Sequence, residues 1–280
     1  METSSYQFRL KSITVNNGSA IHPAKLTVFV GPNNSGKSQS LRDIRDLCTG
    51  VKGAKQIVTA AEMSIPKDFK DLYESYAIRG NYQGNDRWEL NCLVPDLTQL
   101  HNIQYQAEPD SSPRGVFRST ARVDENKFIS FYGKALVAHL KTENRLQLVH
   151  EGTGPESPEK SASLLQLLYN SDKEAETEIR KLVQSAFGRS IALDYTTPSR
   201  FAFRISDSFE GLPGDPRELR PHLQNKPRLD DQGDGIRSFV GIVVALKLAN
   251  RGVFLIDEPE AFLHPPQAFR MGATIANFAQ

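Results

Sequence analysis

Apolar residues along the chain follow two patterns, one typical of strands and one typical of helices. Short apolar runs with β-branched residues, or a loose alternation of apolar and polar positions, predict strands. These runs cover residues 8–15, 26–30, 88–94, 116–123, 127–133, 191–195, 200–205 and 253–256. Since helical patterns separate many of these runs, the sequence predicts an α/β fold.

Apolar residues at helical spacing predict helices in the remaining ordered segments. The first predicted helix follows residue 38, has Leu41, Ile44 and Cys48 on one face and stops at Gly50. The second begins near 64–66, with Phe69, Leu72, Tyr73 and Tyr76 at helical spacing. Further helices are predicted at 179–187, ending at Gly188, at 236–248, and from 265–266 onward. Phe269, Ile275 and Phe278 are core candidates of the last helix. Segments rich in Gly, Pro, Ser or charge predict loops at 151–163 and 212–231.

Composition narrows the class of protein but does not by itself give a function. The chain has 280 residues, 39% of them hydrophobic, and a net charge of +1, so no global field favours nucleic acid or membrane. Two cysteines, Cys48 and Cys92, suit a reducing compartment. The longest apolar run, Phe239–Leu246, is too short to span a bilayer, and the N-terminus lacks the apolar core of a signal peptide. We expect a cytoplasmic globular protein with no membrane contact.

The segment GPNNSGKS matches the phosphate-loop pattern G-x-x-x-x-G-K-[ST], with a predicted strand before it and a predicted helix after it. In such a loop, backbone N–H groups converge on phosphate oxygens, and the helix points its positive end there. Lys37 would reach the β- and γ-phosphates, and Ser38 would offer a hydroxyl to Mg²⁺. The candidate nucleotide-binding residues are Gly31, Pro32, Asn33, Asn34, Ser35, Gly36, Lys37, Ser38 and Gln39. The competing interpretation is a Gly-rich turn before an ordinary helix.

The segment VFLIDEPE is an apolar strand that ends in two carboxylates. Asp257 can hold Mg²⁺, directly or through water, and Glu258 is the natural general base for the water that attacks the γ-phosphate. Taken alone, the segment also fits an acidic turn after a core strand. Together with the phosphate loop it predicts nucleotide hydrolysis, with Lys37 and Glu258 as catalytic residues and with Ser38 and Asp257 as metal ligands.

The stretch QGDGIRSFVGIVVALKLA leads directly into the LIDE strand. A Gly-rich turn that opens an apolar helix just before a DE strand resembles ABC-type ATPase heads. More narrowly, GPNNSGKS, GDGIRS and LIDEPEAFLHPP resemble the ATPase portion of the OLD family (overcoming lysogenization defect) and related RecF/SMC-like proteins. The resemblance implies an α/β P-loop NTPase fold, an ABC-type head with a central mixed β-sheet flanked by helices. It implies one domain over 1–280, with 1–50 and 232–280 as nucleotide-binding core and 51–231 as an intervening lobe.

The same resemblance implies ATP and Mg²⁺ as cofactors and a head-to-head dimer or higher oligomer. Gly233, Asp234 and Gly235 would form the signature turn, which contacts the γ-phosphate bound by the other subunit. Residues 261–264 would lie at the dimer interface, and Arg145 in TENRL would match an Arg-containing segment of these heads. The glutamine loop is not distinguished by the sequence, and its candidates are Gln83, Gln99, Gln104 and Gln106.

Two departures from the family pattern limit the resemblance. Gly233 stands where the family often has Ser, which removes one hydroxyl from the signature turn. Those heads continue into a strand with a His that contacts the γ-phosphate, and OLD nucleases continue into a metal-dependent TOPRIM domain. Neither is predicted after Glu260, and His264 lies too near the DE turn to replace that His. We therefore expect a C-terminally incomplete head, either part of a longer protein or completed by a partner.

Three functions fit these motifs. The first is an ATPase switch that controls a nuclease-like or DNA-associated effector protein, in antiviral defence or genome maintenance. The second is a nucleotide-gated scaffold that hydrolyses ATP poorly and binds a partner protein or DNA. The third is a kinase or another phosphotransferase, although the DE pair favours water as the acceptor.

DNA contact is left open by the distribution of basic residues. Arg114, Arg118 and Arg122 recur every four residues, but the segment 116–123 is a predicted strand and acidic residues follow it, so a solvated face is favoured. A second cluster is diluted by Asp207, Glu210, Asp215 and Glu218, and its members are Arg200, Arg204, Arg217, Arg220, Lys226 and Arg228.

Overall fold

The computed structural model of the chain describes residues 6–66, 72, 75–76, 80–84, 87–106, 125–154, 161–197 and 199–280. The chain divides into two compact units, and each is described by itself. The first comprises Met1–Asp96, Leu100–His139 and Asn250–Asp257, and the second comprises Leu97–Gln99, Leu140–Ala249 and Glu258–Gln280. Asp257 and Glu258 are neighbours in the sequence but belong to different units.

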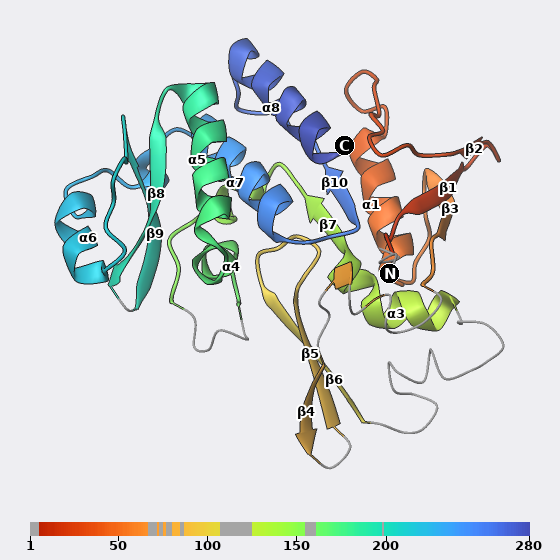
Figure 1. Ribbon diagram of the computed structural model, residues 1–280. Coiled ribbons are helices and arrows are strands. Elements are labelled where there is room, and N and C mark those ends of the chain that lie inside the picture. The colour runs from red at the N-terminus through yellow and green to blue at the C-terminus, as the bar shows by residue number, and fades with distance from the viewer. Residues whose placement is uncertain are drawn as a thin grey trace, which may run out of the picture. The chain divides into compact units, whose positions relative to one another are not determined.

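Small sheets and two described helices make up the first unit. Its elements are β1 (Leu10–Val15), β2 (Ala20–Ile21), α1 (Lys37–Cys48), β3 (Val58–Met63), β4 (Gly80–Gly84), β5 (Arg87–Leu93), β6 (Leu100–Gln106), α3 (Glu125–Leu136), β7 (Val137–Leu140) and β10 (Val253–Ile256) (Figure 1). The strand orders are β2-β1-β3, β4-β5-β6 and β10-β7. In the first of these sheets, Ile13 of β1 lies opposite Ile21 and Ala61 in antiparallel pairing.

One apolar core holds the first unit together. Leu41, Ile44 and Cys48 are buried on one face of α1, where they join Ile13 of β1 and Phe128 of α3 in a single cluster. This face follows the helical period, which is why the sequence forms a helix here. Because α1 starts at Lys37, packing of this face fixes the direction in which the preceding loop enters the helix.

The second unit is built around a buried helix. Its elements are η2 (Arg145–Gln147), α4 (Leu164–Asn170), α5 (Lys173–Phe187), β8 (Ser190–Thr197), β9 (Arg200–Ser206), α6 (Pro216–Leu223), η3 (Leu229–Asp231), α7 (Asp234–Leu248) and α8 (Pro265–Phe278) (Figure 1). Nine residues of α7 are buried, and the ring of Phe239 packs edge-on against Phe187 of α5 with centroids 5.2 Å apart. Strands β8 and β9 pair as an antiparallel hairpin.

Much of the predicted secondary structure is confirmed. Strands were expected, and are found, at or near β1, β5, β8, β9 and β10, and helices at α1, α5, α7 and α8. Gly188 ends α5 as predicted, in a left-handed conformation. Two predictions lie outside the described residues: the strand at 116–123 and most of the helix after Ser64–Pro66, of which the described residues 72, 75 and 76 are helical.

Two predicted segments have a different secondary structure. The expected strand at 127–133 is part of α3, because Phe128, Tyr132 and Leu136 recur every four residues and are buried on one helical face. The expected loop at 212–231 contains α6. Asp215 caps that helix by accepting a hydrogen bond from the backbone N–H of Arg217, and Pro216 opens its first turn.

The predicted strand at 26–30 is not formed, and this changes the sheet. Among the described residues no strand pairs with it, and the side chain of Val30 is 90% exposed. An apolar run indicates that a segment tends to be buried, but a strand also needs a neighbouring strand to which its backbone can hydrogen-bond. The described residues therefore form four small sheets, and the expected central mixed sheet is not found among them.

The core of α8 also differs from the prediction. Phe269 is 77% exposed and Phe278 is exposed as well, whereas Met271 and Thr274 are buried.

Within the described residues, no helix has the length and apolar character needed to cross a membrane.

Candidate functional site

The phosphate-loop segment is an exposed turn at the start of α1. Gly36 is the N-cap residue of the helix and has φ 89°, a left-handed conformation that glycine adopts without strain. Asn34 is also left-handed, with φ 62°. A chain that alternates into this region turns successive N–H groups toward one side, which is how backbone amides form an anion-binding nest. Residues 31–35 are exposed, so the loop is accessible to a nucleotide.

The side chain of Lys37 is hydrogen-bonded to the backbone of its own loop. Its Nζ donates hydrogen bonds to the carbonyl oxygens of Gly31 and Pro32, both at 2.8 Å. The ammonium group is thereby held over the turn that it was predicted to serve. A phosphate oxygen is a charged acceptor, and charge-assisted hydrogen bonds to it are stronger than those to neutral carbonyls.

Ser38 and Asp257 come together although they are 219 positions apart in the sequence. Ser38 Oγ donates a hydrogen bond to Asp257 Oδ1 at 3.0 Å. Ser38 lies in the first turn of α1, and Asp257 directly follows β10, whose Leu255 is buried. The predicted metal ligands from the two motifs are therefore in direct contact within the first unit.

The chemistry of this pair fits Mg²⁺. Hydroxyl and carboxylate oxygens are ligands that Mg²⁺ accepts, and the ion usually keeps water and substrate phosphates as further ligands. Among the described residues, no cluster of three or more His, Cys, Asp or Glu side chains could hold a metal ion. Mg²⁺ prefers six oxygen ligands, so an ion bound by Ser38 and Asp257 would take nucleotide phosphates and water for the rest of its coordination.

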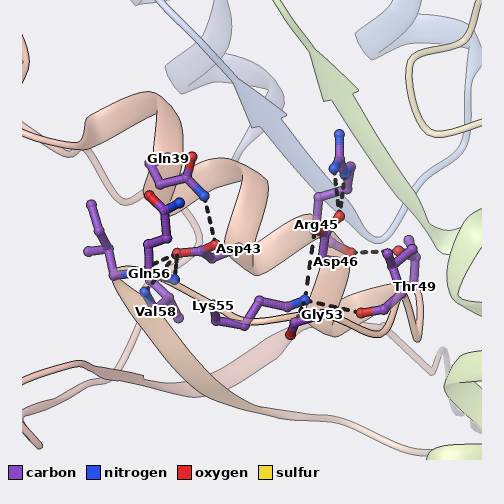
Figure 2. Close-up of polar contacts among 11 residues, drawn as sticks. Gln39, Asp43, Arg45, Asp46, Thr49, Gly53, Lys55, Gln56 and Val58 are labelled. Atoms are coloured by element: carbon purple, nitrogen blue, oxygen red, sulfur yellow. Dashed lines mark hydrogen bonds and ion pairs between the residues drawn. The ribbon is translucent and has the colours of Figure 1, made fainter.

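Asp43, a buried carboxylate that was not predicted as a site residue, binds the segment 56–58 beside α1. Asp43 Oδ2 accepts hydrogen bonds from three consecutive backbone N–H groups (Figure 2), those of Gln56, Ile57 and Val58, at 3.2, 2.8 and 3.1 Å. Its other oxygen, Oδ1, accepts one from Gln39 Nε2 at 2.9 Å. Gln39, predicted as a nucleotide-binding residue, therefore has its side-chain amide engaged by Asp43. The spacing of Gln39 and Asp43 by four positions was the available signal.

The environment of Asp43 shifts its titration. Burial raises the pKa of this carboxyl, but the hydrogen bonds from Ile57, Gln39 and the flanking amides outweigh burial, so the pKa lies below the usual 3.8. The carboxylate is therefore charged at neutral pH and fixes residues 56–58 beside α1. Ile57, in this segment, approaches the loop at Gly36, where a Cβ atom would lie 2.1 Å from Ile57 Cδ1.

Glu258, the predicted general base, lies in the second unit and is held by two residues of one segment. Thr142 Oγ1 donates a hydrogen bond to Glu258 Oε2 at 3.3 Å, and Arg145 Nη1 donates to the Glu258 carbonyl oxygen at 2.9 Å. The backbone of Glu258 has φ 44°, a left-handed conformation that costs about 1–2 kcal/mol in residues other than glycine. The carboxylate itself is exposed.

The predicted signature turn and the predicted interface segment lie together in the second unit. A cavity of about 530 Å³ is lined by both, and its wall consists of Phe187, Arg189, Ile205, Gln232, Gly233, Asp234, Gly235, Ile236, Phe262, Leu263, His264 and Gln267. Two helices start at this cavity, α7 at Gly233 and α8 at His264, and neither cap residue makes a side-chain hydrogen bond to its helix. Because Pro265 and Pro266 have no N–H, the first turn of α7 offers more uncapped backbone N–H groups to an anion than the first turn of α8 does.

The remaining candidate residues lie in other elements. Gln83 lies in β4 and Gln104 and Gln106 lie in β6, while Gln99 is exposed. In the second basic cluster, Arg200 and Arg228 both pair with Glu151, and Arg204 pairs with Asp194 at 2.8 Å. These ion pairs reduce the charge available for phosphate contact. Arg114, Arg118 and Arg122 lie outside the described residues.

Comparison with protein families gives one match and one negative result. Residues 26–279 match a family described as "AAA domain, putative AbiEii toxin, Type IV TA system". Comparison with curated proteins found no match. The family match supports an α/β P-loop domain of the ATPase type, for which nucleotide is the expected ligand, and confirms that part of the sequence-based prediction. The match does not test membership of the OLD family or an ABC-type architecture, and both stay predictions. Because the match covers nearly the whole chain, including both motifs that meet at Ser38 and Asp257, this chain belongs to the AAA-domain family so described.

Proposed function

We propose that the chain binds ATP with Mg²⁺ and hydrolyses it to ADP and phosphate. The observation that carries this proposal is the contact between Ser38 Oγ and Asp257 Oδ1, because it joins the phosphate loop to the DE strand at the oxygens that a metal would need. Bound Mg²⁺ would neutralise charge on the phosphates. Membership of an AAA-domain family supports ATP as the nucleotide.

In this mechanism each motif residue has one task. Backbone N–H groups of Gly31–Ser38 bind the phosphates, and Lys37 exchanges the carbonyls of its own loop for phosphate oxygens. Glu258 accepts a proton from the water molecule whose oxygen attacks the γ-phosphorus. The bond between that phosphorus and the bridging oxygen breaks, and ADP leaves with the bonding electrons.

We further assign the active form to a dimer of two heads. The support is the cavity of the second unit, where Gly233–Gly235 and Phe262–His264 line one space next to the N-terminus of α7. A surface of this kind suits the γ-phosphate of a nucleotide that is bound by a second copy. If the heads act in pairs, ATP turnover per chain will rise with protein concentration until the dimer is saturated.

The proposed output is control of an effector protein, nuclease-like or DNA-associated, in antiviral defence. Its support is the family description, which names a putative AbiEii toxin of a type IV toxin–antitoxin system, together with the resemblance of the three motif blocks to OLD-type ATPases. This part rests on analogy between proteins that share a fold.

The test of the proposed activity is ATP turnover by the Glu258→Gln variant. We expect a fall in kcat of about 100-fold or more, because amide nitrogen cannot accept the proton of the attacking water. Glu260→Gln is the matched control: the same change at another exposed glutamate, two positions along the chain, leaves turnover near the wild-type value. Phosphate release at saturating ATP and Mg²⁺ measures both. If Glu258→Gln hydrolyses ATP as fast as the wild type, Glu258 is not the base. Tight ATP binding with no turnover at any protein concentration would instead favour the nucleotide-gated scaffold.

A further inference from the structure

The backbone at Glu258 needs support from its surroundings. A glutamate with φ 44° is in a sparsely populated region, and such a conformation persists only where neighbouring groups hold it. The carbonyl oxygen of Glu258 accepts hydrogen bonds from two groups, the N–H of Ala261 at 2.9 Å and Nη1 of Arg145 at 2.9 Å. The first closes the local turn, and the second ties the turn to a segment more than a hundred positions away in the sequence.

The side chain of Glu258 is held by the same distant segment. Thr142 Oγ1 donates to Oε2 of the carboxylate at 3.3 Å. Backbone and carboxylate of one residue are thus fixed by Thr142 and Arg145, which are three positions apart. A threonine hydroxyl can donate one hydrogen bond, so its contact with Oε2 selects one orientation of the carboxylate.

This segment is itself anchored, so it can act as a rigid support. Arg145 is 0% exposed, and among the described residues it is the largest fully buried side chain. On its other side, η2 packs against α7: a Cβ atom at Gly241 would lie 2.8 Å from the carbonyl oxygen of Arg145. Arg237 Nη2 in α7 also donates to the Leu146 carbonyl oxygen at 3.3 Å. A reactive group keeps one geometry when the residues that contact it are themselves held by packing and hydrogen bonds.

We propose that Thr142 and Arg145 are positioning residues for Glu258. Arg145 holds the backbone of the turn, and Thr142 orients the carboxylate so that Oε1 is the oxygen left to take the proton of the attacking water. The inference rests on the proposed function, since it assigns a purpose to the contacts of the proposed base. Neither residue touches the nucleotide in this account, so the two act on the rate of hydrolysis and not on the binding of ATP.

The experiment compares Thr142→Val with Thr142→Ser in steady-state ATP hydrolysis. Valine has nearly the shape of threonine without the hydroxyl, while serine keeps the hydroxyl. We expect Thr142→Val to lower kcat by about ten- to a hundredfold, the usual cost of a misplaced catalytic group, with KM for ATP within about twofold of the wild type. Thr142→Ser restores most of the rate. Thr177→Val, the same change at an exposed position of α5, serves as the matched control.

The outcomes separate this inference from the proposed function. If the wild type does not turn over ATP, or if Glu258→Gln does not slow it, the proposed function fails and the inference fails with it. If Glu258→Gln is slow while Thr142→Val is as fast as Thr142→Ser, only the inference is overturned. Equal loss in the valine and serine variants, or a raised KM at unchanged kcat, would also overturn it. The test uses Thr142 because Arg145 is fully buried, and substitutions there will also affect folding.

Discussion

At the scale of single residues, two charged side chains of the first unit, Asp43 and Arg251, are bound by backbone groups. Asp43 accepts from three backbone N–H groups, and Arg251 donates from Nη1 and Nη2 to the carbonyl oxygens of Lys134 and Leu93 at 3.1 and 2.8 Å. Burial lowers the pKa of Arg251 to about 10, so it stays charged at neutral pH. A charge bound to backbone fixes the course of the chain, and both residues hold segments of the first unit next to a motif.

Replacing Asp43 by Asn will lower the free energy of unfolding by about 2–3 kcal/mol at pH 7, because a neutral amide binds the three N–H groups of residues 56–58 less strongly. Since the pKa of Asp43 is lowered in the folded state, its contribution is complete above the unfolded value of 3.8 and is lost as the pH falls through the lower, folded value. Urea unfolding will therefore show a gap between wild type and variant that is constant at neutral pH and narrows in acid.

The control for this prediction is Asp207→Asn, whose side chain is 91% exposed beside Arg189. We expect it to change the free energy of unfolding by less than about 0.5 kcal/mol. A gap for Asp43→Asn that does not depend on pH would show that the charge of Asp43 is unimportant.

At the scale of elements, helices are placed by close packing as well as by apolar faces. Asp172 caps α5 by accepting from the N–H of Ala175 at 2.8 Å, and an apolar stripe buries Ile179 and Val183. Such signals are local, so α5 was predictable from the sequence. Helix α7 also depends on Gly241, where the backbone of η2 comes too near for any side chain, and only the folded structure reveals this approach.

Gly241→Ala will destabilise the protein although alanine favours helices. The added Cβ would lie 2.8 Å from the Arg145 carbonyl oxygen, so η2 or α7 must shift, at a cost of about 1–3 kcal/mol. Gly272→Ala in α8 has no atom within 4 Å of the new Cβ and will stabilise by about 0.5–1 kcal/mol. Thermal unfolding of the two variants should move the midpoint in opposite directions. Stabilisation by both would mean that η2 does not pack tightly on α7.

Secondary structure was predictable where a local signal decided it. The prediction failed where the element depended on pairing with another strand. The run at 26–30 reads as a strand, but no described strand pairs with it, and the segment at 127–133 has a helical period that was mistaken for a strand. Phe269 was a core candidate as an apolar residue of the last predicted helix, yet neighbouring elements decide burial and leave it exposed. Sequence patterns carry propensity and period, whereas burial and strand pairing are set by the rest of the molecule.

At the scale of the whole molecule, the two motifs were predictable but their supports were not. The residues of the phosphate loop and of the DE strand were predicted from their motifs and from the strands and helix predicted beside them, and the structure places Ser38 against Asp257. The contacts of Asp43 with residues 56–58, and those of Thr142 and Arg145 with Glu258, join segments that are distant in the sequence, so only the folded structure shows them. The chain also passes from one compact unit to the other between Asp257 and Glu258, so the proposed metal ligand and the proposed base belong to separate units.

The central claim is that the loop at Gly31–Ser38 and the carboxylate of Asp257 form one site for ATP and Mg²⁺. Calorimetric titration of ATP into the protein tests it most directly, with and without Mg²⁺, for the wild type, for Lys37→Ala and for the exposed control Lys11→Ala. We expect Mg²⁺-dependent binding by the wild type and by Lys11→Ala, and binding at least about tenfold weaker by Lys37→Ala, since a charge-assisted hydrogen bond is lost. Equal affinity of Lys37→Ala and wild type, or binding by the wild type that Mg²⁺ does not change, would contradict the account.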